Sequence, residues 1–76
     1  MDKQEIEKMA LHNERCALSK LKRIKHPKNP NARYVPNGLI KVTIEGEWYS
    51  CVRYYDDQTG AEYARRPEEF HNFTPV

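Results

Sequence analysis

The densest apolar pattern in the chain runs from residue 39 to residue 55, with the sequence LIKVTIEGEWYSCVRYY. This stretch holds most of the β-branched and aromatic residues. It is broken once by Glu45-Gly46 and is closed by the turn-forming run DDQTG at residues 56–60. Apolar runs bounded by such residues are typical of β-strands. The pattern therefore predicts a β-hairpin around which the rest of the chain is arranged.

The register of this hairpin decides which side chains enter the core, because a slip of one residue exchanges the two faces. If Gly46 supplies the positive φ of a type I turn with a G1 bulge, Val42 lies opposite Trp48. We prefer this register because it gathers more apolar area on one face, which a helix can cover. That face carries Ile40, Val42, Trp48, Val52 and Tyr54, and the other shows Lys41, Thr43, Tyr49, Cys51, Arg53 and Tyr55.

A tight two-residue turn at Glu45-Gly46 is the alternative. It would pair Val42 with Tyr49 and Ile40 with Cys51. Trp48, Val52 and Tyr54 would then lie on the opposite side from Ile40, together with Leu39.

Residues 1–25 contain neither Gly nor Pro, and their apolar positions follow helical spacing with an interruption at Asn13. Asp2 and Glu5 have the spacing of a capping box, and Pro27 disfavours helical geometry in the residue before it. The pattern predicts one long N-terminal helix over residues 1–25. A helix of that length overhangs strands of ordinary length, so we expect its second apolar pair, Leu11 and Leu18, to contact another copy in a homodimer, or a partner.

The segment 26–38 holds three prolines, which predicts an extended connector without a core of its own. Residues 61–65 can return as a third strand with Tyr63 inward. Pro67 opens a single helical turn, after which Phe70 and Phe73 close the end of the sheet. The expected fold is a single α+β domain over residues 1–76. In it, a long N-terminal helix packs on a twisted three-stranded antiparallel sheet (39–66) that is followed by a C-terminal turn and tail (67–76).

The composition of the chain narrows the possible classes of protein only slightly. A chain of 76 residues with 38% hydrophobic residues supports one small core, which makes self-association a reasonable expectation. The net charge of +2 names no partner, but residues 1–33 carry nine basic and four acidic residues, whereas residues 34–76 carry four and seven. Two cysteines are too few for a disulfide framework, and no apolar run suits a membrane span. We expect a cytoplasmic protein without a cofactor.

The C-terminal stretch YARRPEEFHNF at residues 63–73 resembles the ending of small uncharacterised phage and prophage proteins, in which an SH3-like sheet precedes an Arg-Pro-x-Glu-x-Phe segment. Here Arg66, Pro67, Glu69 and Phe70 match that ending. The resemblance covers the C-terminal half, and the long N-terminal helix departs from it. It implies a phage or mobile-element origin, an SH3-like tendency in the sheet, and action by binding to host machinery in the host cytoplasm.

Side chains that could support metal binding or catalysis are few. His12 and Cys16 lie one helical turn apart, and Cys51 with His71 could complete a zinc site, but no C-x-x-C pair is present. Cys51 could also pair with His26 or His71 as a nucleophile. So short a chain has little material for an active site, and we expect neither a metal site nor an enzyme.

A run of six cations without an intervening acidic residue follows the predicted helix. Such a cluster can neutralise phosphates, and a neighbouring tyrosine can stack on a base. It can equally complement the dipole at the end of a helix. The candidate phosphate-binding residues are Lys20, Lys22, Arg23, Lys25, Lys28, Arg33 and Tyr34.

The aromatic residues exceed what three short strands hide, and Tyr and Trp are common in protein-binding hot spots. In the preferred register Tyr49, Arg53 and Tyr55 stand together on the exposed face. The leading hypothesis is a non-enzymatic, phage-type accessory protein that uses these three residues to bind and inhibit a host protein or defence complex. The alternatives are a nucleic-acid-binding protein that uses the basic cluster, and an oligomeric nucleotide sponge.

Overall fold

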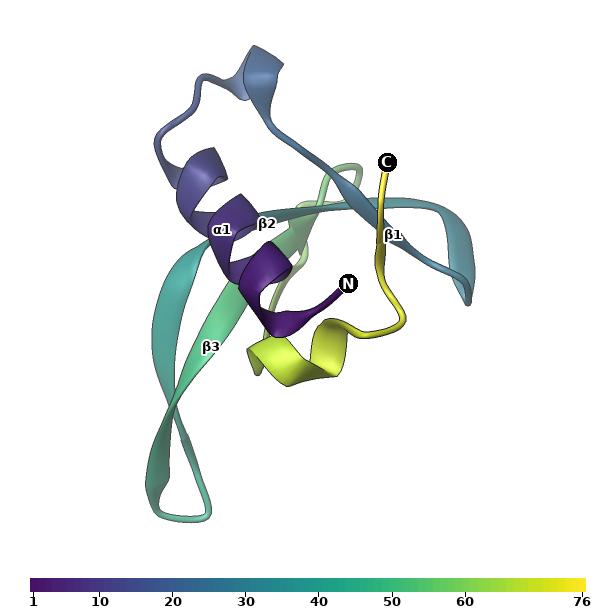
Figure 1. Ribbon diagram of the computed structural model, residues 1–76. Coiled ribbons are helices and arrows are strands. Elements are labelled where there is room, and N and C mark those ends of the chain that lie inside the picture. The colour runs from purple at the N-terminus through teal and green to yellow at the C-terminus, as the bar shows by residue number, and fades with distance from the viewer.

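The computed structural model describes residues 1 to 76 and forms one helix and a five-stranded antiparallel sheet (Figure 1). The strand order is β4-β3-β2-β1-β5. The α+β class is confirmed, but the sheet has five strands instead of three and the helix is shorter than predicted. The elements are α1 (Lys3–Glu14), η1 (Leu18–Lys20), β1 (Ile24–His26), β2 (Asn29–Ile44), β3 (Glu47–Asp56), β4 (Glu62–Arg65), η2 (Pro67–Phe70) and β5 (Thr74–Pro75), of which η1 and η2 are short 3-10 helices.

Helix α1 begins as predicted and ends early. The Asp2 carboxylate accepts the backbone N–H of Glu5 at 2.8 Å, and this hydrogen bond lowers the pKa of Asp2. The prediction that the helix continues to residue 25 is wrong, because it stops at Glu14. The next residues form a loop and η1 before the chain enters β1.

Asn13 gives the physical reason for the early end. Its side chain is 2% exposed. Its amide group donates to the carbonyl oxygens of Lys22 at 2.9 Å and Pro36 at 2.8 Å, and its oxygen accepts the N–H of Lys22 at 2.9 Å. These three bonds hold the segment after α1 against β2. Asparagine competes for backbone groups in this way, which makes it a poor residue inside helices and a good one near their ends.

The prediction of a free connector at 26–38 is also wrong, because these residues form the end of β1, a tight turn and the first half of β2. The register of β2 against β3 shifts between Pro36 and Leu39, where Gly38 has a φ of 82°. This bulge bends β2, so that one strand pairs with β1 at its start and with β3 along most of its length. A Cβ on Gly38 would lie 3.3 Å from the Glu14 carboxylate, so the end of α1 packs directly on the bulge.

The hairpin adopts the alternative register. Glu45 has a φ of 50° and Gly46 a φ of 82°, and two successive positive values define a type I′ turn. Val42 therefore lies opposite Tyr49, and Trp48 lies opposite Thr43. The preferred register with its G1 bulge is wrong, because the two-residue turn matches the twist of the strands without an extra residue.

The face assignments change with the register. Val52 and Tyr54 are buried, as predicted, but Trp48 is 70% exposed and Tyr49 is half-buried. The prediction that Ile40, Val42, Trp48 and Val52 share one covered face is therefore wrong, since alternation along the strands separates the first two from the last two.

The core fills the space between α1, the sheet and η2. Figure 1 shows η2 beneath the start of α1. The predicted C-terminal turn is confirmed, with Pro67 as its first residue and both Phe70 and Phe73 buried. The amino group of Met1 donates to the carbonyl oxygen of Phe73 at 3.1 Å, so the two ends of the chain meet beside this turn. The core residues are Ile6, Ala10, Ile24, Val52, Tyr54, Phe70 and Phe73.

The observed register predicts the effect of two aromatic truncations on the free energy of unfolding. Trp48→Ala should lower it by less than about 1 kcal/mol, because the side chain is solvated. Phe70→Ala should lower it by about 3 to 5 kcal/mol, with Phe70→Leu as a milder variant should the alanine protein not fold. Urea titration followed by circular dichroism measures both. A Trp48→Ala protein as unstable as the Phe70 variants would contradict the register.

The buried amide of Asn13 predicts a second stability effect. Asn13→Ala leaves three backbone groups without partners and should lower the free energy of unfolding by on the order of 2 to 4 kcal/mol. Hydrogen exchange at the Lys22 amide should accelerate in the same variant. Gln4→Ala, on the exposed side of α1, is the matched control and should change neither quantity measurably. Unchanged protection of the Lys22 amide in Asn13→Ala would show that the side chain does not hold this segment.

Candidate ligand-binding pocket

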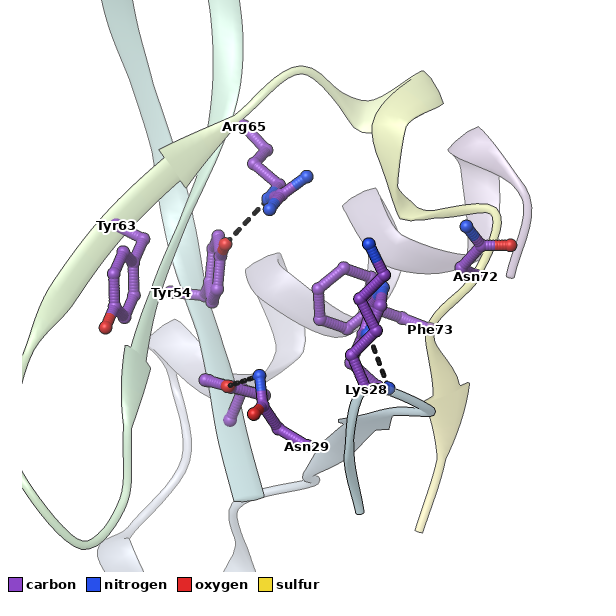
Figure 2. Close-up of a pocket in the computed structure, with 9 residues that line it drawn as sticks. Lys28, Asn29, Tyr54, Tyr63, Arg65, Asn72 and Phe73 are labelled. Carbon is purple, nitrogen blue, oxygen red and sulfur yellow. Dashed lines mark hydrogen bonds between the residues drawn. The ribbon is translucent and has the colours of Figure 1, made fainter. Parts of the chain in front are cut away.

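A cavity of about 400 Å³ opens between the β1–β2 turn, β3, β4 and the segment after η2 (Figure 2). This volume lies within the range of small-ligand sites. The elements that surround it come from both halves of the sequence, and only the five-stranded sheet brings them together. The lining residues are His26, Lys28, Asn29, Tyr34, Tyr54, Tyr63, Arg65, Asn72 and Phe73.

Aromatic rings form one wall and the base of the pocket. Tyr54 and Tyr63 are opposite residues in the β3–β4 ladder, and their rings stack with centroids 5.3 Å apart and planes 28° apart. Tyr34 meets Tyr54 edge-on at 5.7 Å and Phe73 edge-on at 6.0 Å. These are favourable offset and T-shaped geometries. Tyr63 is still 47% exposed, so its ring combines a fixed position with a free surface.

Arg65 joins the aromatic wall to the positive side of the pocket. Its Nε donates to the Tyr54 hydroxyl at 2.8 Å, and its guanidinium lies 5.8 Å from the centre of the Phe73 ring. Burial raises the pKa of Tyr54, although the hydrogen bond from Arg65 acts in the opposite direction, so the phenol stays neutral well above pH 7. The hydrogen bond to Tyr54 uses only Nε, which leaves the terminal nitrogens of Arg65 to donate elsewhere.

The pocket is positively charged, because Lys28 and Arg65 line it and no carboxylate does. Neither cation takes part in any of the four ion pairs of the structure. Asn29 and Asn72 add amide groups that can donate and accept hydrogen bonds. The backbone N–H of Lys28 donates to Nδ1 of His26 at 3.1 Å, which orients the histidine ring against Phe73.

The residues predicted to bind phosphate are distributed over several places. Lys28 and Tyr34 line the pocket. The Nε of Arg23 is 2.7 Å from a carboxylate oxygen of Asp57, and the guanidinium of Arg33 donates to the carbonyl oxygens of Pro30 and Ala32. The remaining three, Lys20, Lys22 and Lys25, are exposed outside the pocket.

The residues predicted to bind a protein partner lie along one face of β3, as alternation requires. Tyr49 is half-buried, with the Arg66 guanidinium 5.1 Å from the centre of its ring. The Nε of Arg53 is 3.1 Å from a carboxylate oxygen of Glu62. Tyr55 is half-buried. Two of the three side chains thus already have a charged neighbour within the molecule.

Sequence reasoning did not select Tyr54, Tyr63, Arg65 or Phe73 as binding residues. A usable signal was present, because the DDQTG turn places Tyr63 opposite a residue of β3 and Arg65 two positions further along the same face. From the β1–β2 turn and the residue after it, sequence reasoning selected Lys28 but not Asn29, since this segment was interpreted as a connector.

The two thiols have different surroundings. The Sγ of Cys16 lies 3.1 Å from Nε2 of His12 on the outside of the molecule. Cys51 is 2% exposed, and burial raises the pKa of its thiol, with a further contribution from the Glu69 carboxylate. No group of three or more His, Cys, Asp or Glu side chains is arranged so that it could hold a metal ion.

Comparisons with known proteins give no relative: no family model, curated protein or solved structure matches the chain. No helix in the structure has the length and apolar character needed to cross a membrane. The class of protein is therefore defined by its own geometry. It is a small α+β domain whose sheet carries an aromatic, positively charged pocket.

The surroundings of the thiols predict unequal reactivity. In the native protein Cys16 should react readily with a water-soluble disulfide reagent. Cys51 should react at least about tenfold more slowly, because it is buried and its pKa is raised, and the thiolate is the reactive form. Peptide mapping after timed labelling measures the two rates, and labelling in urea should make them similar. Equal rates in the native protein would contradict the burial of Cys51.

Proposed function

We propose that this protein is a non-enzymatic binding protein whose pocket accepts a ligand with a planar ring and a phosphate, that is, a nucleotide, free or at an accessible position of a single strand. The observation that carries this proposal is the pocket itself: it has exposed aromatic surface and two cations without ion-pair partners, and no carboxylate lines it. An anionic ligand meets no repulsion there, and an aromatic ligand has rings to stack on.

Each part of such a ligand has a matching group in the pocket. The ring of Tyr63 stacks on the outer side of Tyr54 (Figure 2) and offers exposed aromatic surface to a base at the rim of the pocket, and base–aromatic stacking contributes about 1 to 3 kcal/mol. The free nitrogens of Arg65 and the ammonium group of Lys28 can reach a phosphate, and a hydrogen bond to a charged group contributes about 1.5 to 3 kcal/mol. Asn29 and Asn72 can pair with the polar edge of the base.

This proposal places the nucleotide alternative ahead of the host-protein hypothesis. The half-burial of Tyr49 and Tyr55 and the ion pair between Arg53 and Glu62 leave that surface fewer free groups than the pocket has. Inhibition of a host protein or defence complex through these three residues stays a prediction. Pull-down from a host lysate with and without nuclease tests it directly.

The phage-type origin, the cytoplasmic location and the SH3-like tendency also stay proposals. Support for the SH3-like tendency comes from the single antiparallel sheet, in which η2 connects β4 at one edge to β5 at the other. One pocket is lined both by Arg65 of β4 and by Phe73 next to β5, so the two edges of the sheet approach each other there, which indicates a curved sheet.

The pocket predicts which substitutions abolish binding. We expect adenosine monophosphate or a short single-stranded oligonucleotide to bind measurably by calorimetry, and adenosine or inorganic phosphate alone to bind far more weakly. Lys28→Gln and Arg65→Gln should each weaken binding about tenfold or more, and each should reduce the slope of log affinity against log salt by roughly one for the oligonucleotide. Tyr63→Leu should weaken binding with little change in the salt slope.

Lys3→Gln removes one positive charge from α1, which contributes no lining residue, and should bind like the unmodified protein. The proposal that the pocket is the binding site would be contradicted by one pattern of results. In that pattern a variant with Lys20, Lys22 and Lys25 all changed to Gln loses oligonucleotide binding, whereas Lys28→Gln and Arg65→Gln bind normally. The exposed cations of the basic cluster would then be the site. Absence of binding by every nucleotide and strand would also overturn the proposal.

A further inference from the structure

The far half of the β2–β3 hairpin extends away from the rest of the molecule (Figure 1). Beyond the bulge at Gly38, residues 39–44 of β2 pair only with residues 47–52 of β3. β1 pairs with β2 no further along than Tyr34, and β4 meets β3 only from Val52 onward. We call residues 39–52 the arm. Both of its edges lack a neighbouring strand over most of their length.

The β2 edge of the arm presents backbone groups without strand partners. In a two-residue hairpin the closing pair, here Ile44 and Glu47, exchanges both hydrogen bonds, and bonded pairs recur at every second residue. The N–H and C=O groups of Ile44 and Val42 therefore point toward β3, and those of Lys41 and Thr43 point outward. An edge of this kind is a template for another strand.

The side chains beside this edge are apolar and partly exposed. Ile40 is 44% exposed, Ile44 is 41% exposed, and Val42 between them is half-buried. All three share one face, because they occupy alternate positions of β2. Exposed strand edges are usually blunted by prolines or by charged side chains such as lysine, and residues 39–44 contain no proline and a single charge, Lys41.

We propose that this edge is a homodimer interface, in which β2 of one copy pairs antiparallel with β2 of a second copy about a two-fold axis through Val42. In this register Val42 lies opposite Val42 of the second copy, and Ile40 lies opposite Ile44 of the second copy. The apolar side chains of both arms then form one continuous surface across the axis. Lys41 lies opposite Thr43 of the second copy, with the outward backbone groups of both residues paired.

Apolar complementarity supports a second copy as the occupant, because each of the three apolar residues beside the edge lies opposite another apolar residue. Lys41 lies opposite the neutral Thr43 of the second copy, and its diagonal neighbours, Glu45 and Lys41 of the second copy, have opposite charges. Moving the axis to Lys41 would set two lysines directly opposite each other, which is destabilising. Moving it to Thr43 would set Ile40 opposite Gly46 and shorten the ladder. The three apolar residues beside the edge are self-complementary about Val42.

This inference is independent of the proposed function, because no residue of the β2 edge lines the pocket and a dimer would carry two separate pockets. The surface proposed here differs from the one expected from the sequence. That expectation was a homodimer contact through Leu11 and Leu18 on one N-terminal helix, whereas the present proposal uses the β2 edge of the arm. The structure places Leu18 outside α1, in η1.

The first test compares two proline substitutions on opposite edges of the arm. Thr43→Pro removes an outward N–H from the β2 edge, and Ser50→Pro removes the equivalent N–H from the β3 edge, where Lys41 and Ser50 are opposite residues. We expect the unmodified protein and Ser50→Pro to sediment as dimers at micromolar to millimolar concentration. Thr43→Pro should sediment as a folded monomer or dimerise at least about tenfold more weakly. Equal association of both variants would overturn the proposal, as would an unmodified protein that stays monomeric throughout.

The second test fixes the register. In a Cys16→Ser, Cys51→Ala background, Val42→Cys should form an intermolecular disulfide under mild oxidation, because residues opposite each other in a non-bonded pair have Cα atoms about 4.5 Å apart, within the range that a disulfide spans. Ser50→Cys in the same background is the matched control and should not cross-link at a comparable rate. Cross-linking of Ser50→Cys equal to or faster than that of Val42→Cys would exclude this interface.

Discussion

Two successive residues with left-handed backbone, Glu45 and Gly46, determine the side on which each β3 side chain lies. Only glycine adopts this conformation freely, and a glutamate there costs about 1 to 2 kcal/mol. The turn persists because the register that it sets buries Val52 and Tyr54 in the core. A slip of one residue would expose both and bury Trp48. The stacked tyrosines, the pocket and the outward edge of the arm all depend on this turn.

The parts of the fold that follow from local sequence signals could be predicted. The cap at Asp2, the hairpin across Gly46, the third strand at 61–65 and the turn at Pro67 each carry their own signal, and the structure contains all four. The early end of α1 could not be predicted, because it depends on hydrogen bonds between Asn13 and backbone groups that are distant in sequence. The extra strands were missed for a related reason: prolines favour a connector, but strands tolerate them at an edge or a bulge.

The site was predicted less completely than the fold, and the reason is physical. A cluster of cations in the sequence does not specify where their charges lie after folding. Lys28 and Tyr34 reach the pocket because the β1–β2 turn returns toward β3, whereas Arg23 is paired with Asp57 on another part of the surface. Arg65, which completes the pocket, belongs to the acidic half of the chain. Strand pairing, and not the charge pattern, joins these residues.

The positive character of the pocket therefore arises from where the carboxylates lie. The second half of the chain carries a net negative charge, but most of its acidic residues near the body of the fold face a cation outside the pocket. Each such pair is exposed and contributes little stability. The effect of such a pair is on the electrostatic potential around the pocket, because the cation neutralises a carboxylate that would otherwise repel an anion. Lys28 and Arg65 remain the unpaired charges at the pocket. The pairs are Arg23 with Asp57, Arg53 with Glu62, and Arg66 with Glu68 and Glu69.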